Sequence, residues 1–349
     1  MSSLVEINNL SVSYPVLGGI LGRRIGEIQA VNSVSFTIQK QEVVGLVGES
    51  GCGKSTLGKA LLRLIEPNSG TIHFDGTSVC SIDRSSLRKL RKRMQMIFQD
   101  PFSSLNPRMK VGSILSEPFV IHKLCAPNQI KTRVGELLEI VGLRPESYEK
   151  YPHEFSGGQR QRIGIARALA VKPDFIVADE PVSALDVSIQ SQILNLLKKL
   201  QTDFHLTYLF VSHDLNVIRY LCDRVVVMYL GKIMEVLNRD QLIDPHYKKH
   251  PYTEALIASA PRSHPDEIRT RKPLQGDIPS PQCPPSGCVF HTRCPEVQEL
   301  CKKTVPVLKP SKGPSGLVAC HYRGIDSLSS PNPWSDVPTD KDIGRRPSD

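Results

Sequence analysis

Residues 43–56 read VVGLVGESGCGKST, and this stretch decides the fold. VVGLV is a short, uninterrupted apolar run, which is the pattern of a β-strand buried on both faces of a sheet. The glycine-rich turn after it leads into residues 55–65, STLGKALLRLI, whose apolar spacing predicts a helix. A buried strand, a glycine turn and a helix in this order predict an α/β protein with a mostly parallel sheet.

The glycine turn fits the phosphate-loop pattern GxxxxGK[ST] from Gly48 to Ser55. Glycine N–H groups can approach phosphate oxygens without side chains in the way, and the helix N-terminus adds its positive end. Lys54 is expected to reach the β- and γ-phosphates, and the Ser55 hydroxyl is expected to ligate Mg²⁺. The predicted nucleotide-binding residues of this loop are Gly48, Glu49, Ser50, Gly51, Cys52, Gly53, Lys54, Ser55 and Thr56.

Two further buried strands end in residues that suit phosphate chemistry. Residues 175–180, FIVADE, end in Asp179, which is placed to hold Mg²⁺, and Glu180, which is placed to orient or deprotonate an attacking water. His213 ends the run LFVSH and could contact the γ-phosphate. An acid pair before proline more often starts a helix, and a histidine at a strand end is usually structural. Both functional interpretations therefore depend on the phosphate loop.

The rest of the chain is read from its periodicity. Residues 1–45 alternate apolar and polar positions, which predicts antiparallel strands, with residues 17–27, LGGILGRRIGE, as a loop between them. Prolines 101, 107, 118 and 127 break residues 100–165 into short pieces with helical spacing, which predicts a helical subdomain inserted into the core. Residues 224–236, RVVVMYLGKIMEV, predict a hairpin.

Composition excludes some classes of protein and leaves others open. The 349 residues include 40% hydrophobic and 23% charged residues, an ordinary balance for a globular protein. The net charge of +9 suits phosphates, an anionic membrane face or nucleic acid, but a solvated basic surface explains it equally well. The sequence predicts neither a membrane-spanning helix nor a signal peptide, so any membrane role is expected to be peripheral. The nine cysteines are expected to be reduced thiols, with Cys52 beside the nucleotide able to react.

The motif set resembles the ATP-binding-cassette (ABC) ATPase family over residues 4 to about 240. FSGGQRQR, residues 155–162, looks like the family signature, with Phe155 where leucine is commoner. The resemblance implies that Gln99 is the glutamine of the family's Q-loop and a Mg²⁺ ligand. It also implies that Asp186 ends the D-loop SALD and that His213 is the family's switch histidine. It also implies that Tyr14 stacks on adenine, although an ordinary strand aromatic would look the same.

The resemblance implies a head-to-tail pair of ATPase subunits with ATP between them. One subunit's phosphate loop would face the other's signature, here Ser156, Gly157, Gly158 and Gln159. The signature precedes a helix, so its N–H groups and positive end could meet the γ-phosphate from the far side. The resemblance further implies that Gln99, at the start of the helical insertion, senses the nucleotide and moves a surface that docks on a membrane partner.

Longer stretches resemble the oligopeptide/dipeptide importer branch, and most of all the second of its paired ATPases. They include MIFQDPFSSLNPRM (96–109) and HPYTEALIASAP (250–261). The branch implies a peptide importer at the cytoplasmic face of the inner membrane. Its other parts would be a second ABC ATPase (heterodimer, or homodimer as the alternative), two permease subunits and, indirectly, a solute-binding protein.

Two alternative functions stay open at this point. Nickel or another small solute is an alternative substrate. A non-transport ATPase acting on nucleic acid or ribosomes is the other alternative, and it is disfavoured because the chain has one cassette and a short insertion. No nucleic-acid partner is expected.

A cysteine cluster follows a proline-rich stretch. The spacings x5, x6 and x18 between Cys288, Cys294, Cys301 and Cys320 are looser than zinc sites usually show, and iron–sulfur clusters tolerate them better. The branch resemblance implies a [4Fe–4S] cluster here. Zinc and a set of buried thiols remain the alternatives, and Cys283, His291 and His321 are alternative ligands.

The expected fold is a P-loop ABC-type nucleotide-binding domain with a small cysteine-containing C-terminal region. Residues 4–240 form the ATPase domain, with a parallel-sheet core, an antiparallel N-terminal β-subdomain and the helical insertion at about 100–165. Residues 241–323 form the C-terminal region. Residues 324–349, rich in polar residues and proline, are expected to be a disordered tail.

Overall fold

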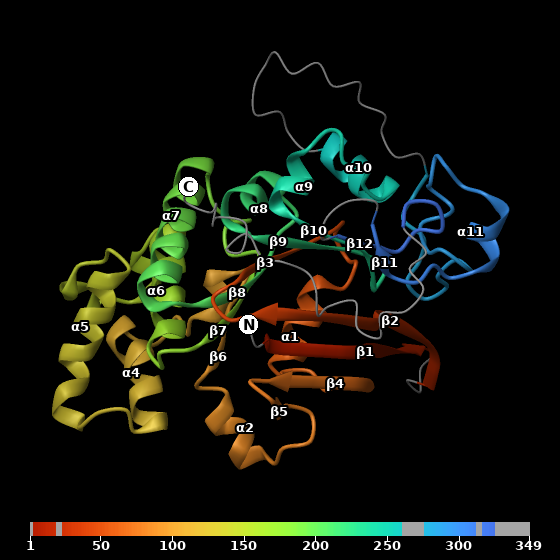
Figure 1. Cartoon of the computed structure of the whole chain (residues 1–349). Coiled ribbons are helices and arrows are strands. Elements are labelled where there is room, and N and C mark those ends of the chain that lie inside the picture. The colour runs from red at the N-terminus through yellow and green to blue at the C-terminus, as the bar shows by residue number, and fades with distance from the viewer. Residues whose placement is uncertain (1–2, 19–22, 260–275, 312–315, 325–349) are drawn as a thin grey trace, which may run out of the picture. The chain divides into compact units, whose positions relative to one another are not determined.

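The computed structural model describes residues 3–18, 23–259, 276–311 and 316–324. Most of the expected tail therefore lies outside the described residues. The chain divides into two compact units, residues 1–80 with 212–349 and residues 81–211, and each is described by itself. Figure 1 gives the order of the elements along the chain.

The first unit begins with an antiparallel sheet, as the alternating pattern predicted. Its strands are β1 (Ser3–Gly18), β2 (Arg23–Gln39), β4 (Ser69–Phe74) and β5 (Thr77–Ser78), in the order β2-β1-β4-β5. The prediction that residues 17–27 form a loop was wrong at both ends, because Leu17 pairs with Arg24 and Gly18 with Arg23. A backbone ladder needs no particular side chain, so a ribbon can continue where apolar alternation has stopped.

The second sheet of this unit contains the strand before the phosphate loop. In the order β11-β12-β10-β9-β3 it consists of β3 (Val43–Val47), β9 (Arg224–Tyr229), β10 (Lys232–Asn238), β11 (Lys309–Pro310) and β12 (Leu317–Val318). Strand β3 is fully buried and parallel to β9, as its apolar run predicted. Strands β9 and β10 form the predicted hairpin, and positive φ values at Leu230 and Gly231 suit its tight turn.

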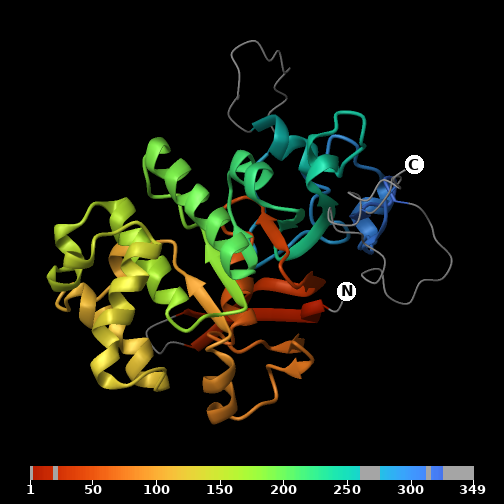
Figure 2. The same cartoon turned by 60° about the vertical axis from the view of Figure 1, so that its left-hand side comes forward.

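Among the residues that the structure describes, five helices complete the first unit, and the last of them belongs to the C-terminal segment. They are α1 (Lys54–Leu61), α8 (Leu215–Leu221), α9 (Arg239–Ile243), α10 (Pro251–Ser259) and α11 (Glu299–Lys303). Figures 1 and 2 show the segment from residue 276 onward (blue) beside α10 and β10. The pairing of β10 with β12 and the contact of Phe290 with Tyr252 of α10 fix it there.

A buried ion pair ties β9 to the turn before β3. Arg224 Nε lies 2.7 Å from Glu42 Oε1, and Arg224 Nη2 lies 3.0 Å from Glu42 Oε2. Nη2 also donates to the Thr37 carbonyl at 2.6 Å. Both charged side chains are almost fully buried. Two charges removed from water are tolerated only when their hydrogen-bonding groups are paired, as they are here.

The second unit has a parallel sheet and a group of helices. Strands β6 (Met94–Ile97), β7 (Phe175–Asp179) and β8 (Thr207–Val211) pair in parallel in the order β8-β7-β6, and β7 and β8 are fully buried as predicted. The helices are α2 (Arg84–Leu90), α3 (Pro101–Ser104), α4 (Val111–His122), α5 (Ile130–Ile140), α6 (Gly157–Leu169) and α7 (Val187–Phe204). Three short 3₁₀ turns lie among them, at Pro127–Gln129, Pro145–Glu149 and Pro152–Glu154.

The predicted proline breaks hold in part. Pro101 begins α3 and Pro127 begins a 3₁₀ turn, but Pro118 lies inside α4. The helix therefore loses one backbone hydrogen bond. Burial of Leu115 and Phe119 on the core side of α4 offsets that loss.

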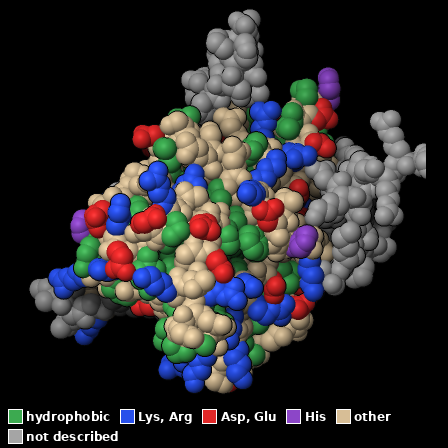
Figure 3. All heavy atoms as spheres, turned by 90° about the vertical axis from the view of Figure 1, so that its left-hand side faces the viewer, with side chains coloured by type: hydrophobic (Ala, Val, Ile, Leu, Met, Phe, Trp, Pro, Cys, Tyr) green, Lys and Arg blue, Asp and Glu red, His purple; other side chains and the backbone are tan. Residues whose placement is uncertain are grey.

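Two observations bear on the expected surroundings of the chain. On the face shown in Figure 3, Lys and Arg side chains lie among Asp and Glu side chains, with more of the basic ones toward its lower edge. Among the described residues, no helix has both the length and the apolar character needed to cross a membrane.

A buried carboxyl group in β10 makes stability depend on pH. Glu235 is fully buried, and its Oε2 accepts the His250 N–H at 3.0 Å. Burial raises the pKa of Glu235 from 4.5 to about 7, although the charge of nearby Lys249 opposes the shift. The folded state keeps a proton that the unfolded chain releases between these two values. Stability therefore falls as pH rises through that window.

We expect Glu235→Gln to raise the midpoint of thermal unfolding at pH 8, because the amide cannot ionise and can still accept the His250 N–H. The gain should be roughly 2–8 °C, and it should largely vanish at about pH 3.5, below both pKa values, where the wild-type group is protonated in both states. Differential scanning calorimetry at both pH values measures it, with the exposed Glu66→Gln as control. An equal gain at both pH values would contradict the titration.

Candidate nucleotide-binding site

The phosphate loop leaves β3 at Val47 and ends where α1 begins at Lys54. Gly53 has φ 103°, and a Cβ atom on it would lie 1.9 Å from the Ala30 carbonyl oxygen. A Cβ atom on Gly48 would lie 2.1 Å from the Met228 carbonyl oxygen. The strand, loop and helix around the motif are confirmed, and these two positions admit no side chain.

Lys54 holds the loop from inside. Its Nζ donates to the carbonyl oxygens of Gly48 at 2.8 Å and Glu49 at 3.0 Å. The side chain is almost fully buried, so its charge faces the loop rather than water.

Burial raises the pKa of the Cys52 thiol, although the charge of Lys54 opposes this shift. The prediction that Cys52 could react therefore finds no support.

Two other predicted residues of the first unit lie near this loop. The Tyr14 hydroxyl is 3.5 Å from Thr56 Oγ1, at the limit of a hydrogen bond. His213 is exposed and follows Ser212, whose N–H donates to the Leu46 carbonyl of β3. His213 therefore lies at the end of β3 from which the phosphate loop emerges. Ser55 also belongs to this unit, at the second position of α1.

The second unit brings together Gln99 and the acid pair. Asp179 is buried as the last residue of β7, and Glu180 follows with φ 43°. Gln99 Nε2 donates to Glu180 Oε2 at 3.0 Å, and the Glu180 N–H donates to the Val211 carbonyl of β8. A left-handed backbone at a residue other than glycine is strained, which is typical of functional positions.

The signature begins α6 with a capping box. Ser156 Oγ accepts the Gln159 N–H at 3.3 Å, and Gln159 Oε1 accepts the Ser156 N–H at 3.0 Å. A Cβ atom on Gly158 would lie 2.4 Å from Ile189 in α7, so this glycine also allows two helix starts to approach. The first N–H groups of a helix have no partner within it, as the anion-binding interpretation requires.

Asp186 is the N-cap residue of α7, and its carbonyl accepts the N–H groups of Ile189 and Gln190. Leu185, just before it, lies where a Cβ atom on Gly157 would make contact at 3.3 Å. The D-loop and the signature are thus neighbours within the second unit. The predicted Mg²⁺ set is divided between the units, with Ser55 in the first and Gln99 and Asp179 in the second.

Residues 31–183 match the family described as ABC transporter, and residues 234–301 match the family described as oligopeptide/dipeptide transporter, C-terminal region. An oligopeptide transport ATP-binding protein of Bacillus subtilis, AppF, is 51% identical over 322 residues, covering 91% of this chain and 97% of the relative. The chain belongs to the ABC transporter ATPases. It carries the C-terminal region of their oligopeptide/dipeptide branch.

Two further comparisons agree with this membership. A probable peptide ABC transporter ATP-binding protein of Sinorhizobium fredii is 49% identical, covering 92% of this chain and 90% of the relative. A dimeric ATP-binding cassette solved in a post-hydrolysis state with ADP and Pi is 30% identical, with a TM-score of 0.60, over 67% of this chain and 98% of that one. The predicted ABC-type α/β fold and ATP hydrolysis are confirmed, and this ABC ATPase uses ATP and Mg²⁺.

The C-terminal region of this ABC ATPase gathers its four predicted cysteines. Cys288, Cys294, Cys301 and Cys320 line one cavity of about 20 Å³, together with His250, His291 and His321. Burial, with the neighbouring cysteines adding to it, raises the pKa values of Cys288 and Cys294 to about 11. Cys283 is exposed and is not among the lining residues of this cavity. Within the described part of the chain, no three His, Cys, Asp or Glu residues are arranged to hold a metal ion.

The two histidines proposed as alternative ligands face backbone carbonyls. His291 Nδ1 lies 2.9 Å from the Cys288 carbonyl, and His321 Nε2 lies 3.0 Å from the Thr304 carbonyl. A ring nitrogen facing a carbonyl oxygen carries the proton. These nitrogens are therefore donors here, and metal binding would have to use the other nitrogen of each ring.

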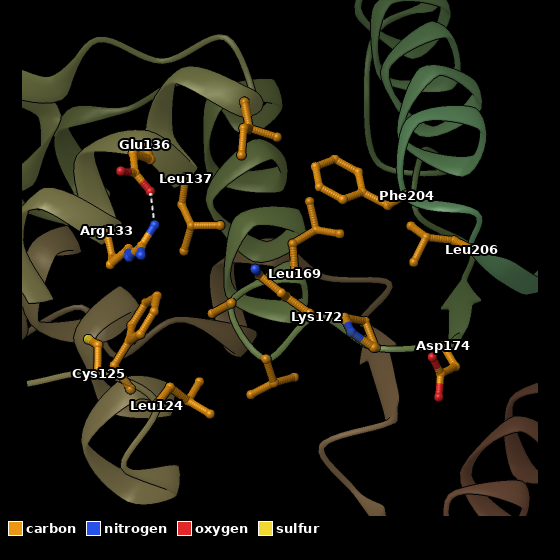
Figure 4. Close-up of a pocket in the computed structure, with 15 residues that line it drawn as sticks. Leu124, Cys125, Arg133, Glu136, Leu137, Leu169, Lys172, Asp174, Phe204 and Leu206 are labelled. Carbon is orange, nitrogen blue, oxygen red and sulfur yellow. Dashed lines mark hydrogen bonds and ion pairs between the residues drawn. The ribbon is translucent and has the colours of Figure 1, made fainter.

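The helices of the second unit enclose an apolar pocket of about 590 Å³. Figure 4 shows Leu124 and Leu137 on one side and Phe204 and Leu206 on the other. Charged side chains also line it, including the ion pair of Arg133 with Glu136 at 2.9 Å and the side chains of Lys172 and Asp174. The sequence did not predict this pocket, because its walls come from separate helices with no shared motif.

Sequence reasoning also missed two residues that contact the phosphate loop. Arg293 forms an ion pair with Glu49, and the Tyr252 hydroxyl accepts the Glu49 N–H. Tyr252 lies in HPYTEALIASAP, which resembled the oligopeptide branch, and Arg293 lies between Cys288 and Cys294 of the cysteine cluster, for which the same branch implied a role. The resemblance suggested no role for either, and neither stretch has a pattern that points to a phosphate loop.

Proposed function

We propose that this chain is the ATP-hydrolysing subunit of a transporter that imports peptides across a membrane. The observation that carries the proposal is a phosphate loop of ABC type in the same chain as the oligopeptide/dipeptide C-terminal region. Relatives that are about half identical to it are named for oligopeptide transport and peptide import. No observation favours nickel or nucleic acid over peptides.

The chemistry divides among residues that the chain supplies. Backbone N–H groups of the phosphate loop and the Lys54 ammonium bind the phosphates. The N–H groups of Glu49 and Cys52 are excepted, because they donate to the Tyr252 hydroxyl and the Glu49 carbonyl. Ser55, Asp179 and Gln99 would be the ligands of Mg²⁺, which when bound would neutralise phosphate charge. Tyr14 contacts the base, and His213 contacts the γ-phosphate. In a head-to-tail pair, the signature residues 156–159 and Asp186 of one subunit complete the site of the other.

Glu180 is the residue proposed to act on the attacking water. Its carboxylate lies at the end of a buried strand and accepts the Gln99 amide at 3.0 Å. A carboxylate can orient the water and take its proton as the bond to the γ-phosphate forms. Gln99 lies just before α3, so the same contact links the helices of the second unit to this group.

We expect Glu180→Gln to retain ATP binding and to lose hydrolysis by about 10²- to 10⁴-fold, since the amide cannot take a proton. Equilibrium binding of a fluorescent ATP analogue and phosphate release measure the two effects separately. The exposed Glu139→Gln in α5 is the matched control. Wild-type turnover in the Glu180 variant would refute the assigned role.

The assembly we propose has a second ABC ATPase as a heterodimer, two permeases and, indirectly, a solute-binding protein. This ATPase would act at the cytoplasmic face of the inner membrane. The pocket of Figure 4 suits an inserted permease segment, because both apolar and charged side chains line it. We also propose residues 4–240 as the ATPase domain and 241–323 as the C-terminal region.

Co-purification from mildly solubilised membranes tests the assembly. We expect two polytopic membrane proteins and a second cassette ATPase in stoichiometric amounts, and stimulation of ATPase activity by a peptide-loaded solute-binding protein. Recovery with ribosomes or nucleic acid would overturn the transport proposal. Stimulation by a nickel-loaded binding protein alone would replace peptides as the substrate.

We further propose that Cys288, Cys294, Cys301 and Cys320 ligate a [4Fe–4S] cluster. Four thiols line one cavity and are the donor type that such a cluster takes, although the described residues hold no three of them in a preformed metal-binding arrangement. When bound, such a cluster supplies a cross-link between segments and a one-electron redox centre. Zinc and free thiols are the alternatives.

Anaerobic purification should yield protein with broad visible charge-transfer absorption and iron and sulfide in equal amounts. Cys301→Ser should lose most of that absorption because a thiolate ligand is gone, whereas Cys283→Ser should keep it. Zinc without visible absorption would establish the zinc alternative, and neither metal would establish free thiols.

A further inference from the structure

Three interactions converge on Glu49, the second residue of the phosphate loop. Its carbonyl accepts Lys54 Nζ at 3.0 Å from within the loop. Its N–H donates to the Tyr252 hydroxyl at 2.9 Å. Its carboxylate accepts Arg293 Nη1 at 2.7 Å and Nη2 at 3.1 Å. Every polar part of this residue is therefore engaged, and two of its partners come from beyond residue 250.

The ion pair between Glu49 and Arg293 is shielded from water. The Arg293 side chain is 7% exposed and that of Glu49 is 22% exposed. The guanidinium also lies over the Tyr229 ring, and its Nε donates to the Gly276 carbonyl at 3.2 Å. Hydrogen bonding to Glu49 raises the pKa of Arg293. A two-pronged, partly buried pair holds its geometry better than a surface pair.

An aromatic cluster connects these contacts to the cysteine cavity. The Tyr252 ring packs against Tyr229 with centroids 4.7 Å apart and against Phe290 at 5.2 Å. Phe290 and Arg293 both lie between Cys288 and Cys294 in the chain. The Arg293 N–H donates to the Phe290 carbonyl, which closes a turn at the cavity wall. The same short segment thus contacts both the cavity and the phosphate loop.

We propose that Arg293 and Tyr252 are positioning residues for the phosphate loop, and that through them the cysteine-bearing segment sets nucleotide affinity. This inference rests on the proposed role of residues 48–56 in binding ATP. The physical reason is charge. A carboxylate in the phosphate loop repels a triphosphate, and Arg293 neutralises that carboxylate and directs it away from the loop's interior. Tyr252 fixes the orientation of the adjoining peptide group.

The test uses the full-length chain and compares Arg293→Gln with Arg323→Gln. Arg323 is a matched control because it is buried to a similar degree in the same segment and pairs with Glu254 and Glu296, away from the loop. We expect Arg293→Gln to weaken binding of Mg²⁺-ATP about tenfold and to raise KM with little change in kcat, since ground-state binding is what is lost. Arg323→Gln should change neither more than about twofold.

A double variant separates positioning from simple structural support. If Arg293 acts by neutralising Glu49, then removing both charges should restore affinity, so Glu49→Gln/Arg293→Gln should bind ATP more tightly than Arg293→Gln alone. Tyr252→Phe keeps the ring packing and removes only the acceptor, and it should weaken binding about threefold. This variant keeps the test available if Arg293→Gln does not fold, as its thermal midpoint would show.

The outcomes distinguish this inference from the proposed function. Lys54→Ala, measured in parallel, should lose nucleotide binding. If it binds ATP as the wild type does, the loop is not the nucleotide site and the proposed function fails. If Lys54→Ala loses binding while Arg293→Gln and Tyr252→Phe match Arg323→Gln, the inference alone is overturned. Equal affinity of the double variant and Arg293→Gln would also overturn it.

Discussion

A crowded backbone is the constraint on which the rest of the first unit depends. The phosphate loop passes so close to the carbonyls of Ala30 and Met228 that Gly53 and Gly48 have no room for a Cβ atom. The position of the loop therefore depends on β2, which contains Ala30, and on β9, which contains Met228 and pairs with β3. Lys54 then closes the loop by donating to two of its own carbonyls. The nine residues 48–56 therefore have to satisfy the packing of the core, the geometry of the backbone and the binding of phosphate together.

Buried charges follow one pattern at two places in this protein, where each charge is paired with an opposite one. The buried side chains of Arg224 and Glu42 are joined by two hydrogen bonds. Arg293 and Glu49 are also joined by two hydrogen bonds. Glu235 departs from this pattern, because burial favours its protonated form. In an ATPase that must bind a highly charged nucleotide, pairing protein charges in advance limits repulsion near the phosphates.

Much of the site could be predicted from sequence, and the misses have physical reasons. The phosphate loop, the acid pair after β7 and the β9–β10 hairpin were predicted because each is a contiguous pattern. Pro118 lies inside α4 although proline usually breaks a helix, because tertiary packing outweighs one lost hydrogen bond. Residues 17–27 read as a loop because apolar alternation ends there, yet most of them pair as strands.

Contiguous motifs were enough to predict the fold class, the ABC ATPase family and the residues of the phosphate loop, because backbone requirements for binding phosphate are met by neighbours in the chain. The contact of Gln99 with Glu180 and the contact of Arg293 with Glu49 became visible only in the folded chain, which also brings the four cysteines predicted as a cluster to one cavity. These contacts join residues from 6 to 244 positions apart in the chain. No local periodicity encodes such pairs, because their proximity follows from how sheets and helices pack.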